Sequence, residues 1–416
     1  MSESPSVSSL APAEFPELPP VAGVLLAAHT AELRYRGRPD VMLAALAPGS
    51  RVAGVFTRSR CASAPVDWCR EHVARGTARA VLCNAGNANA FTGAAGEAAV
   101  IASARAVAEA LDAAPEDVFL ASTGVIGEPL GAEAMRAAVG QAADALGPPS
   151  PERWREAADA IRTTDTFPKG AGGEAHLDGE TVRVAGIAKG SGMIAPDMAT
   201  MLAFAFTDAD LPAPVLQSLL AGAVDRSFNR ITVDSDTSTS DSVLLFATGA
   251  VKPARPVTDA ADPRLSELRA LLDTTMLDLA HQIVRDGEGA SKFVEVTVEG
   301  AESDGAARRI ALSIGNSPLV KTMLAAADAN WGRLVMAVGK AGEAASRDRL
   351  DLWIGDEQCA EGGRIRKGYS EERATEHLKG QEVRLRADVG VGTGRDTIWT
   401  CDLTHAYIDI NAGYRS

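Results

Sequence analysis

Thr200 is the side chain of this sequence whose setting suits a nucleophile. It follows Ala199 near the end of a glycine-rich run that a proline interrupts, residues 189–202. If the chain bends there, the Thr200 hydroxyl can attack the carbonyl group before it, and cleavage makes Thr200 a new N-terminus. Its free α-amine, whose ordinary pKa is roughly 7.7–8.0, then serves as the base for its own hydroxyl. An ordinary turn between two strands is the alternative, because glycine, proline and small residues also form turns.

Thr123 and Gly124 could stabilise the negative charge that such an attack creates. They follow a predicted strand over residues 117–121 and begin a turn. A glycine N–H beside a threonine hydroxyl offers two hydrogen-bond donors to an oxyanion. Taken alone, the same residues also fit a plain turn in which the threonine side chain bonds to the backbone.

Other polar residues stand where a substrate could bind. Residues 163–169 form a dense polar cluster after a predicted helix, either as a helix cap or as a substrate loop. Glu288 lies between two glycines after another predicted helix, where the helix dipole disfavours an anion, so a binding role gains weight. Asn411 and Ser416 belong to the tail, which a predicted strand over residues 401–410 would tie down.

The sequence gives no support for a bound cofactor. Residues 190–195 match the glycine pattern of dinucleotide-binding proteins, but Pro196 follows, and residues 197–206 are too short and too apolar for the helix that must come next. No phosphate-binding loop occurs, and none of the six histidines forms a metal-spaced pair. We therefore expect neither a nucleotide cofactor nor a metal.

The composition is typical of a soluble globular protein with two domains or several layers. Of the 416 residues, 46% are hydrophobic and 23% are charged, and the net charge is −14. That charge argues against nucleic acid and anionic membranes as partners, because both need clustered lysine and arginine. No apolar run is long enough to span a bilayer. The five cysteines are widely spaced and form no C-x-x-C pair, which fits a reducing cytoplasm.

Hydrophobic periodicity predicts the elements that would position these residues. We expect strands at residues 24–26, 51–56, 80–83, 117–121, 181–187, 201–207, 242–246 and 293–298. We expect helices at residues 100–111, 132–146, 152–162, 214–224 and 265–284. Strands and helices come in irregular blocks, which favours an α+β fold with mixed sheets. Residues 1–20 are rich in serine, proline and glutamate, and we expect them to be a flexible leader.

Nine stretches of the chain match the sequence patterns of a known family. They lie at residues 54–58, 86–90, 122–127 (STGVIG), 163–166, 189–196 (KGSGMIAP), 198–202, 286–290, 328–333 and 411–416. In this order they resemble the ornithine acetyltransferase family, the bifunctional glutamate N-acetyltransferase and amino-acid acetyltransferase of arginine biosynthesis. The resemblance covers nearly the whole chain after the leader.

The resemblance implies a fold and a maturation step. The fold would be a layered αββα sandwich with mixed sheets, of the autoprocessed N-terminal-nucleophile type. Cleavage between Ala199 and Thr200 would give an α chain, residues 21–199, and a β chain, residues 200–416, and two of each would assemble into a heterotetramer. One departure is visible, because Asp197 stands where many members carry asparagine. We expect the chain still to be cleaved with aspartate at this position, and we predict no rate for that cleavage.

The resemblance also implies roles for individual residues. Thr200 would be the nucleophile, and Thr123 and Gly124 would form the oxyanion hole. The residues that would hold the amino-acid substrate are Thr166, Lys189, Thr200, Glu288, Asn411 and Ser416. The enzyme would move the acetyl group from N2-acetylornithine to glutamate through an acetyl-threonine, without metal or prosthetic group. Acetyl-CoA would be a second donor if the enzyme is bifunctional, and the site of action would be the cytoplasm.

Two rival functions belong to other classes. An N-terminal-nucleophile aminopeptidase or amidase of similar fold would pass the acyl group to water, and it should lack the combination of Lys189 and Glu288 for a free amino acid. A non-catalytic ligand-binding protein with a glycine-rich turn at residues 190–192 predicts an intact chain and binding without turnover.

Overall fold

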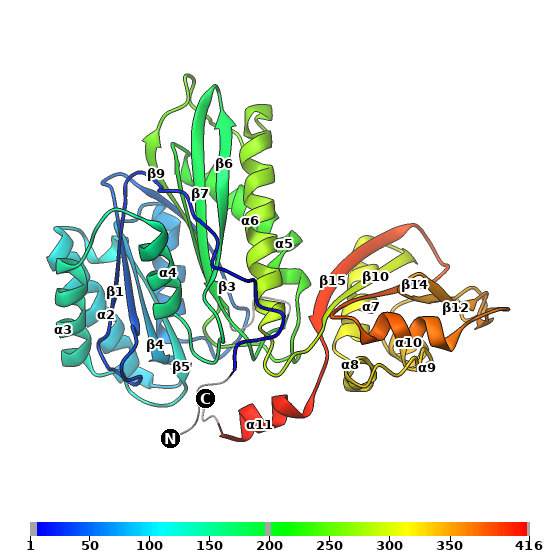
Figure 1. Cartoon of the computed structure of the whole chain (residues 1–416). Helices are drawn as coiled ribbons and strands as arrows, with labels where there is room; N and C mark the ends of the chain where they lie inside the picture. Colours follow the sequence, from blue (N-terminus) through cyan, green and yellow to red (C-terminus); the bar gives the residue numbers. More distant parts are fainter. Residues whose placement is uncertain (1–5, 196–200, 414–416) are drawn as a thin grey trace. The chain divides into compact units, whose positions relative to one another are not determined.

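Three β-sheets form the framework of the part of the chain that this computed structural model describes, residues 6–195 and 201–413 (Figure 1). The chain divides into two units. Among the described residues, the larger unit contains residues 12–229 and 236–283, and the smaller unit contains residues 6–11, 230–235 and 284–413.

The larger unit contains two of the sheets. The first, in the order β1-β2-β4-β5, comprises β1 (Val24–His29), β2 (Val41–Leu46), β4 (Ala80–Asn87) and β5 (Val118–Val125). The second, in the order β3-β9-β8-β7-β6, comprises β3 (Arg51–Phe56), β9 (Ser242–Val251), β8 (Leu202–Ala209), β7 (Glu180–Lys189) and β6 (Lys169–Leu177). The helices of this unit are α1 (Ala64–His72), α2 (Gly93–Leu111), α3 (Ala132–Asp144), α4 (Pro151–Ala160), α5 (Ala213–Arg226) and α6 (Ser266–Arg285).

An apolar core between the two sheets holds them face to face. Phe119 of the first sheet meets Phe246 of the second edge-to-face, with ring centroids 6.1 Å apart. Strand β2 is buried at every position, as expected of a central strand with neither face in water. Its uniformly apolar sequence lacks the alternation that marks a half-buried strand, and for that reason periodicity did not predict it.

Helices cover the outer face of each sheet, so the larger unit has the expected αββα layers. Helices α2 and α3 pack on the first sheet through an apolar cluster that includes Val107 and Val139 (Figure 1). On the second sheet, Gln217 of α5 exchanges two hydrogen bonds with the backbone of Gly54, at 3.0 and 3.1 Å. Gln282 of α6 does the same with Gly170, at 3.1 and 2.8 Å.

Parallel and antiparallel strand pairs occur in both units. Strands β4 and β5 are parallel, as are β8 and β9, whereas β7 and β8 are antiparallel. The α+β class with mixed sheets is therefore confirmed. The predicted cleavage point between residues 199 and 200 falls between β7 and β8, which are neighbours in one sheet, and not between the two units. Two chains produced there would remain paired along that sheet.

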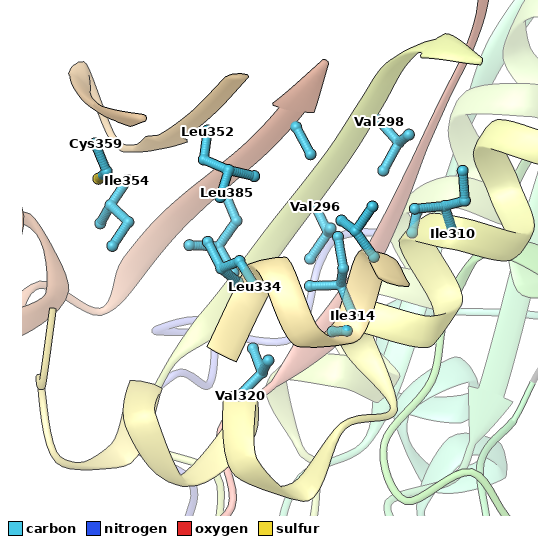
Figure 2. Close-up of a cluster of buried hydrophobic side chains, with 14 of the residues drawn as sticks. Val296, Val298, Ile310, Ile314, Val320, Leu334, Leu352, Ile354, Cys359 and Leu385 are labelled. Carbon is cyan, nitrogen blue, oxygen red and sulfur yellow. The ribbon is translucent and has the colours of Figure 1, made fainter. Parts of the chain in front are cut away.

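The smaller unit is built on the third sheet. Its order is β13-β12-β11-β14-β10-β15, with strands β10 (Phe293–Ala301), β11 (Asp351–Ile354), β12 (Glu357–Glu361), β13 (Arg364–Ile365), β14 (Glu382–Asp388) and β15 (Gly394–Cys401). Its helices are α7 (Asp304–Gly315), α8 (Pro318–Ala325), α9 (Gly332–Gly339), α10 (Glu371–Lys379) and α11 (His405–Gly413). Figure 2 shows its core, where Val296 and Val298 of β10 lie with Ile310 and Ile314 of α7.

The predicted strand over residues 401–410 is wrong. Strand β15 ends at Cys401, and residues 405–413 form helix α11. The hydroxyl of Thr404 accepts a hydrogen bond from the Ala406 N–H at 3.2 Å, which is the usual way in which threonine begins a helix. The short apolar–polar pattern of this segment fits either structure, and this cap favours the helix.

The expected flexible leader makes packing contacts over its second half. Leu18 is 2% exposed and belongs to the core between the sheets, with Phe15 packed against the same cluster. The Trp154 indole donates a hydrogen bond to the Pro19 carbonyl oxygen at 3.2 Å. Residues 15–19 are therefore part of the folded larger unit.

No disulfide bond links the five cysteines, all of which lie among the described residues. All five cysteines are free thiols, and four of them are buried. Within residues 6–195 and 201–413, no helix combines the length and apolar character needed to cross a bilayer.

Candidate active site

Lys189 joins the two sheets of the larger unit at their ends. It is the last residue of β7, it is 2% exposed, and its ammonium donates to the hydroxyls of Thr123 at 3.1 Å and Thr163 at 2.9 Å. Thr123 lies on β5 of the other sheet. A buried ammonium is tolerated only when its hydrogens find acceptors, so this arrangement fixes the position of the charge.

The contact with Lys189 fixes the direction in which the Thr123 hydroxyl bonds. An ammonium has three donors and no acceptor, so the Thr123 oxygen must accept. The hydroxyl keeps its own hydrogen for donation to another oxygen. This is the behaviour required of an oxyanion-hole donor, and the neighbouring ammonium strengthens it by polarising the hydroxyl.

Gly124 occupies a position that only glycine can fill. Its φ is +130°, and a Cβ atom built on it would lie 2.3 Å from the carbonyl carbon of Gly86. Gly86 is its partner in the parallel pairing of β4 and β5. The close approach of the two backbones explains why β5 needs glycine after Thr123. The expected turn does not begin there, because β5 continues to Val125.

Asp165 balances part of the positive charge around Lys189. Its Oδ1 atom accepts from the Lys169 ammonium at 2.7 Å and from the Gly190 N–H at 2.6 Å, and its Oδ2 atom lies 4.0 Å from the Lys189 nitrogen. Burial alone would raise the pKa of Asp165, but the charges of Lys169 and Lys189 and the Gly190 N–H outweigh it and hold that pKa well below its usual range. Asp165 thus links the Lys169 ammonium to the backbone of Gly190 next to the Lys189 ammonium.

Replacing Lys169 by methionine should destabilise the protein strongly. Lys169 and Asp165 are both fully buried, so the variant leaves a carboxylate in the core without its closest counter-ion. Removing one partner of a buried ion pair lowers the free energy of unfolding by about 3–5 kcal/mol. Because Asp165 keeps its other contacts, we expect a loss at the lower end of that range. Urea unfolding of the purified protein measures the effect.

The matched control is Lys379→Met. Lys379 forms an ion pair with Glu376 in which both side chains are exposed to solvent. It should change the free energy of unfolding by less than about 0.5 kcal/mol. Equal losses for the two variants would contradict the structural role of Lys169.

Because the pKa of Asp165 is lowered in the folded state, the stability that it adds is present above about pH 4 and is lost as the pH falls below that value.

The described part of the glycine-rich run after β7, residues 190–195, is not helical. Residues 191–193 form bends, and Gly190 and Met193 have φ values of +149° and +57°. The Ser191 hydroxyl lies 2.6 Å from that of Thr164, which ties the run to the polar cluster after α4. No helix begins within residues 190–195, and the absence of a nucleotide cofactor stays a prediction.

Met201 is the described residue that follows the proposed nucleophile in the chain. Ala199 and Thr200 lie outside the described residues. Met201, the next residue, is 2% exposed, and its N–H donates to the Oδ1 atom of Asp241 at 2.7 Å. Thr166 is half-buried in the turn between α4 and β6, one residue after Asp165.

Glu288 and Asn411 meet in the smaller unit. The Asn411 amide donates to the Glu288 carboxylate at 2.7 Å and to the Tyr407 carbonyl oxygen at 2.9 Å. Gly289 allows α11 to approach, because a Cβ there would lie 2.6 Å from the Tyr407 nitrogen. Ser416 lies outside the described residues. Two of the residues expected to hold the substrate are thus hydrogen-bonded to each other, and the tail is structured up to residue 413. Their role in substrate binding stays a prediction.

Sequence reasoning missed several residues of the site. Asp165 and Thr163 lay inside a polar cluster that we did single out, but nothing showed that they bond to Lys169, Lys189 and Gly190. Asp241 gave no signal at all, since it is one polar residue within a serine- and threonine-rich stretch.

The sequence is similar to that of a known family over most of its length. The model of the ArgJ family matches residues 25–416. The chain belongs to the ArgJ family. This ArgJ-family chain is 55% identical over 415 residues to the arginine biosynthesis bifunctional protein ArgJ of Rhizobium meliloti, covering 99% of this chain and 100% of that protein.

Two solved structures are also similar to this ArgJ-family chain. The ArgJ structure from Bacillus halodurans is 40% identical and covers 50% of this chain and 96% of that one, with a TM-score of 0.47. The ornithine acetyltransferase of Mycobacterium tuberculosis, solved in complex with ornithine, is 36% identical and covers 42% of this chain and 92% of that one, with a TM-score of 0.38. Family membership makes this protein an enzyme of the ArgJ type.

Proposed function

We propose that this enzyme transfers the acetyl group of N2-acetylornithine to glutamate, giving ornithine and N-acetylglutamate for arginine biosynthesis. The observation that supports it most directly is the buried Lys189 ammonium bonded to Thr123 at the end of β7. The next strand, β8, begins at Leu202, two residues after Thr200. It pairs antiparallel with β7, with Leu202 opposite Lys189. These contacts support a site at these strand ends, in which Lys189 would bind a substrate carboxylate and Thr123 would bind the oxyanion.

The proposed mechanism begins with cleavage between Ala199 and Thr200. The Thr200 hydroxyl then attacks the acetyl carbonyl carbon of N-acetylornithine, while the new α-amine takes the hydroxyl proton. Thr123 and Gly124 stabilise the oxyanion of the tetrahedral intermediate. The C–N bond breaks, the α-amine returns the proton to the leaving nitrogen, and ornithine departs from an acetyl-threonine ester. The amine of glutamate attacks that ester, and Thr200 is regenerated.

Substrate recognition follows from the charges of the site residues. The Lys189 ammonium suits the carboxylate that both amino acids carry, and the Glu288 carboxylate suits an ammonium group of the substrate. Asn411 orients Glu288 through the hydrogen bond of 2.7 Å. Thr166 and Ser416 complete the proposed substrate set.

The chemistry needs no metal and no prosthetic group, because the acetyl group passes from one substrate to the protein and then to the other. Acetyl-CoA would be a second acetyl donor if the enzyme is bifunctional. The relatives from Rhizobium meliloti and Brucella suis are named bifunctional proteins of arginine biosynthesis. We further propose an assembly of two α and two β chains acting in the cytoplasm.

Steady-state kinetics with N-acetylornithine and glutamate test the proposal. Varying one substrate at fixed concentrations of the other should give parallel double-reciprocal lines, because ornithine leaves before glutamate binds. Release of acetate in excess of N-acetylglutamate would favour an amidase, which passes the acyl group to water. Binding without turnover would favour the ligand-binding alternative. A second assay with acetyl-CoA and glutamate alone decides whether the enzyme is bifunctional.

A further inference from the structure

Arg38 is a partly buried cation on the loop between β1 and β2, and its backbone position is fixed. Asp40 is fully buried in the same loop, and its carboxylate accepts the N–H groups of Ala31 and Leu33 at 2.7 and 2.8 Å. The Asp40 N–H donates to the His29 carbonyl oxygen at 3.0 Å, which closes the loop where β1 ends. A loop held in this way presents Arg38 at a defined place.

Uncharged partners hold the guanidinium of Arg38. Its central carbon lies 3.8 Å from the centroid of the Tyr35 ring, and one of its N–H groups donates to the Arg162 carbonyl oxygen at 2.6 Å. Within residues 6–195 and 201–413 no carboxylate forms an ion pair with Arg38, and its buried Nε atom has no acceptor there. The guanidinium keeps its charge at cellular pH, so this charge needs a counter-ion.

The carboxylates that act on Arg38 from a distance are engaged by other cations. Asp159 pairs with the Arg162 guanidinium at 2.7 Å. Asp165 pairs with the Lys169 ammonium at 2.7 Å. Burial, and to a smaller extent the charge of Arg162, lowers the pKa of Arg38, and the tyrosine ring and the two carboxylates oppose this without cancelling it. A positive charge that the protein compensates only in part favours the binding of an anion.

Arg38 lies a short distance from Lys189 within the larger unit. The Arg162 carbonyl oxygen that accepts from Arg38 is five bonds away from the Thr163 hydroxyl oxygen. That hydroxyl accepts the Lys189 ammonium at 2.9 Å. These contacts keep the bonded nitrogen atoms of Arg38 and Lys189 within about 11 Å of each other.

The two proposed substrates carry opposite charges on their side chains. N-acetylornithine ends in an ammonium group and glutamate in a carboxylate, although both react at the same threonine. Lys189 suits the carboxylate that both carry, and Glu288 suits an ammonium group, but no other cation belongs to the proposed substrate set. An extended glutamate has its carboxyl carbons about 5 Å apart and can therefore bridge two cations about 10 Å apart.

We infer that Arg38 selects the acetyl acceptor, because its guanidinium binds the side-chain carboxylate of glutamate while the Lys189 ammonium binds the α-carboxylate. This inference rests on the function proposed above. N-acetylornithine has no side-chain carboxylate, so Arg38 contributes nothing to its binding. Arg38 therefore acts in the second half of the reaction, when glutamate attacks the acetyl-threonine, and not in the first.

The test compares Arg38→Met with Arg36→Met in the purified enzyme. Methionine keeps an unbranched apolar side chain that can lie on the Tyr35 ring, but it carries no charge. Arg36 is the matched control, because it is an exposed arginine in the same loop. In a ping-pong reaction kcat/KM for each substrate reports the half-reaction of that substrate, so the effects on N-acetylornithine and on glutamate are measured separately in one protein.

We expect Arg38→Met to lower kcat/KM for glutamate by about 10- to 100-fold and to leave kcat/KM for N-acetylornithine within about threefold of the wild type. Arg36→Met should leave both values within about threefold, and Arg38→Lys should restore part of the loss for glutamate. An unchanged value for glutamate in Arg38→Met, or an equal loss for both substrates, overturns the inference. If the wild type releases no ornithine from N-acetylornithine, the proposed function fails instead, so the two failures are distinguishable.

The choice of acceptor by the wild type gives a second readout that does not depend on the folding of a variant. Glutamine has the shape of glutamate but a neutral amide in place of the side-chain carboxylate. We expect kcat/KM for glutamate to exceed that for glutamine by at least about 10-fold, and Arg38→Met to lose most of this preference. A wild type that uses both acceptors equally overturns the inference. An Arg38→Met enzyme that uses glutamate normally but acetyl-CoA poorly would assign the bound anion to a phosphate of that donor and overturns it as well.

Discussion

Thr200→Ala is expected to abolish both cleavage of the chain and transfer of the acetyl group. Alanine has no hydroxyl, so nothing attacks the Ala199 carbonyl group, and no α-amine is formed. The purified variant should have the mass of one full-length chain under denaturing conditions. It should release no ornithine from N-acetylornithine above the background of the uncatalysed reaction.

Thr200→Ser is the control for that variant. Serine keeps a hydroxyl at the same distance from the backbone, and we expect it to retain part of both activities. A Thr200→Ala protein that still transfers acetyl groups would show that another residue carries the acetyl group, and the acetyl-threonine mechanism would have to be given up.

Thr123→Val is expected to lower kcat for acetyl transfer by about 100- to 1000-fold, the usual effect of losing one oxyanion donor. Valine has nearly the shape of threonine but no hydroxyl. The change should affect kcat much more than KM, because the oxyanion exists in the transition state and not in the bound substrate. Initial rates at saturating N-acetylornithine and glutamate measure it.

Thr163→Val separates this effect from a displaced lysine. Thr163 is the other hydroxyl bonded to Lys189, at 2.9 Å compared with 3.1 Å for Thr123, so both valine variants remove one partner of the ammonium. We expect Thr163→Val to lower kcat by less than about 10-fold and Thr123→Ser to restore most of the lost rate. Equal losses in both valine variants would assign Thr123 to holding Lys189 and not to the oxyanion.

The sequence predicted the strand ends of the site well, because its motifs stand where periodic segments stop. Lys189 was placed just after a predicted strand and is the last residue of β7, and Thr123 and Gly124 were placed at the end of the strand that became β5. Alternating or apolar runs are local features, so they can be recognised in the sequence without knowledge of the fold. The layered α+β class followed from the irregular order of the same elements.

The contacts between distant segments could not be predicted. Lys189 and Thr123 are 66 residues apart on different sheets, and Asp241 and Met201 are 40 residues apart. Only the packing of the two sheets and the register of β8 against β9 bring these pairs together. Helix α11 was missed for a different reason, because its start depends on a cap at Thr404 that the apolar pattern of the tail does not reveal.

The most direct test of the central claim is the mass of the denatured protein after brief exposure to N-acetylornithine. We expect two fragments that meet between Ala199 and Thr200, with one acetyl group added to the fragment that begins at Thr200. Addition of glutamate should remove that acetyl group within the time of one turnover. A single unmodified chain of full length, or two fragments that never acquire an acetyl group, would contradict Thr200 as the acetyl carrier.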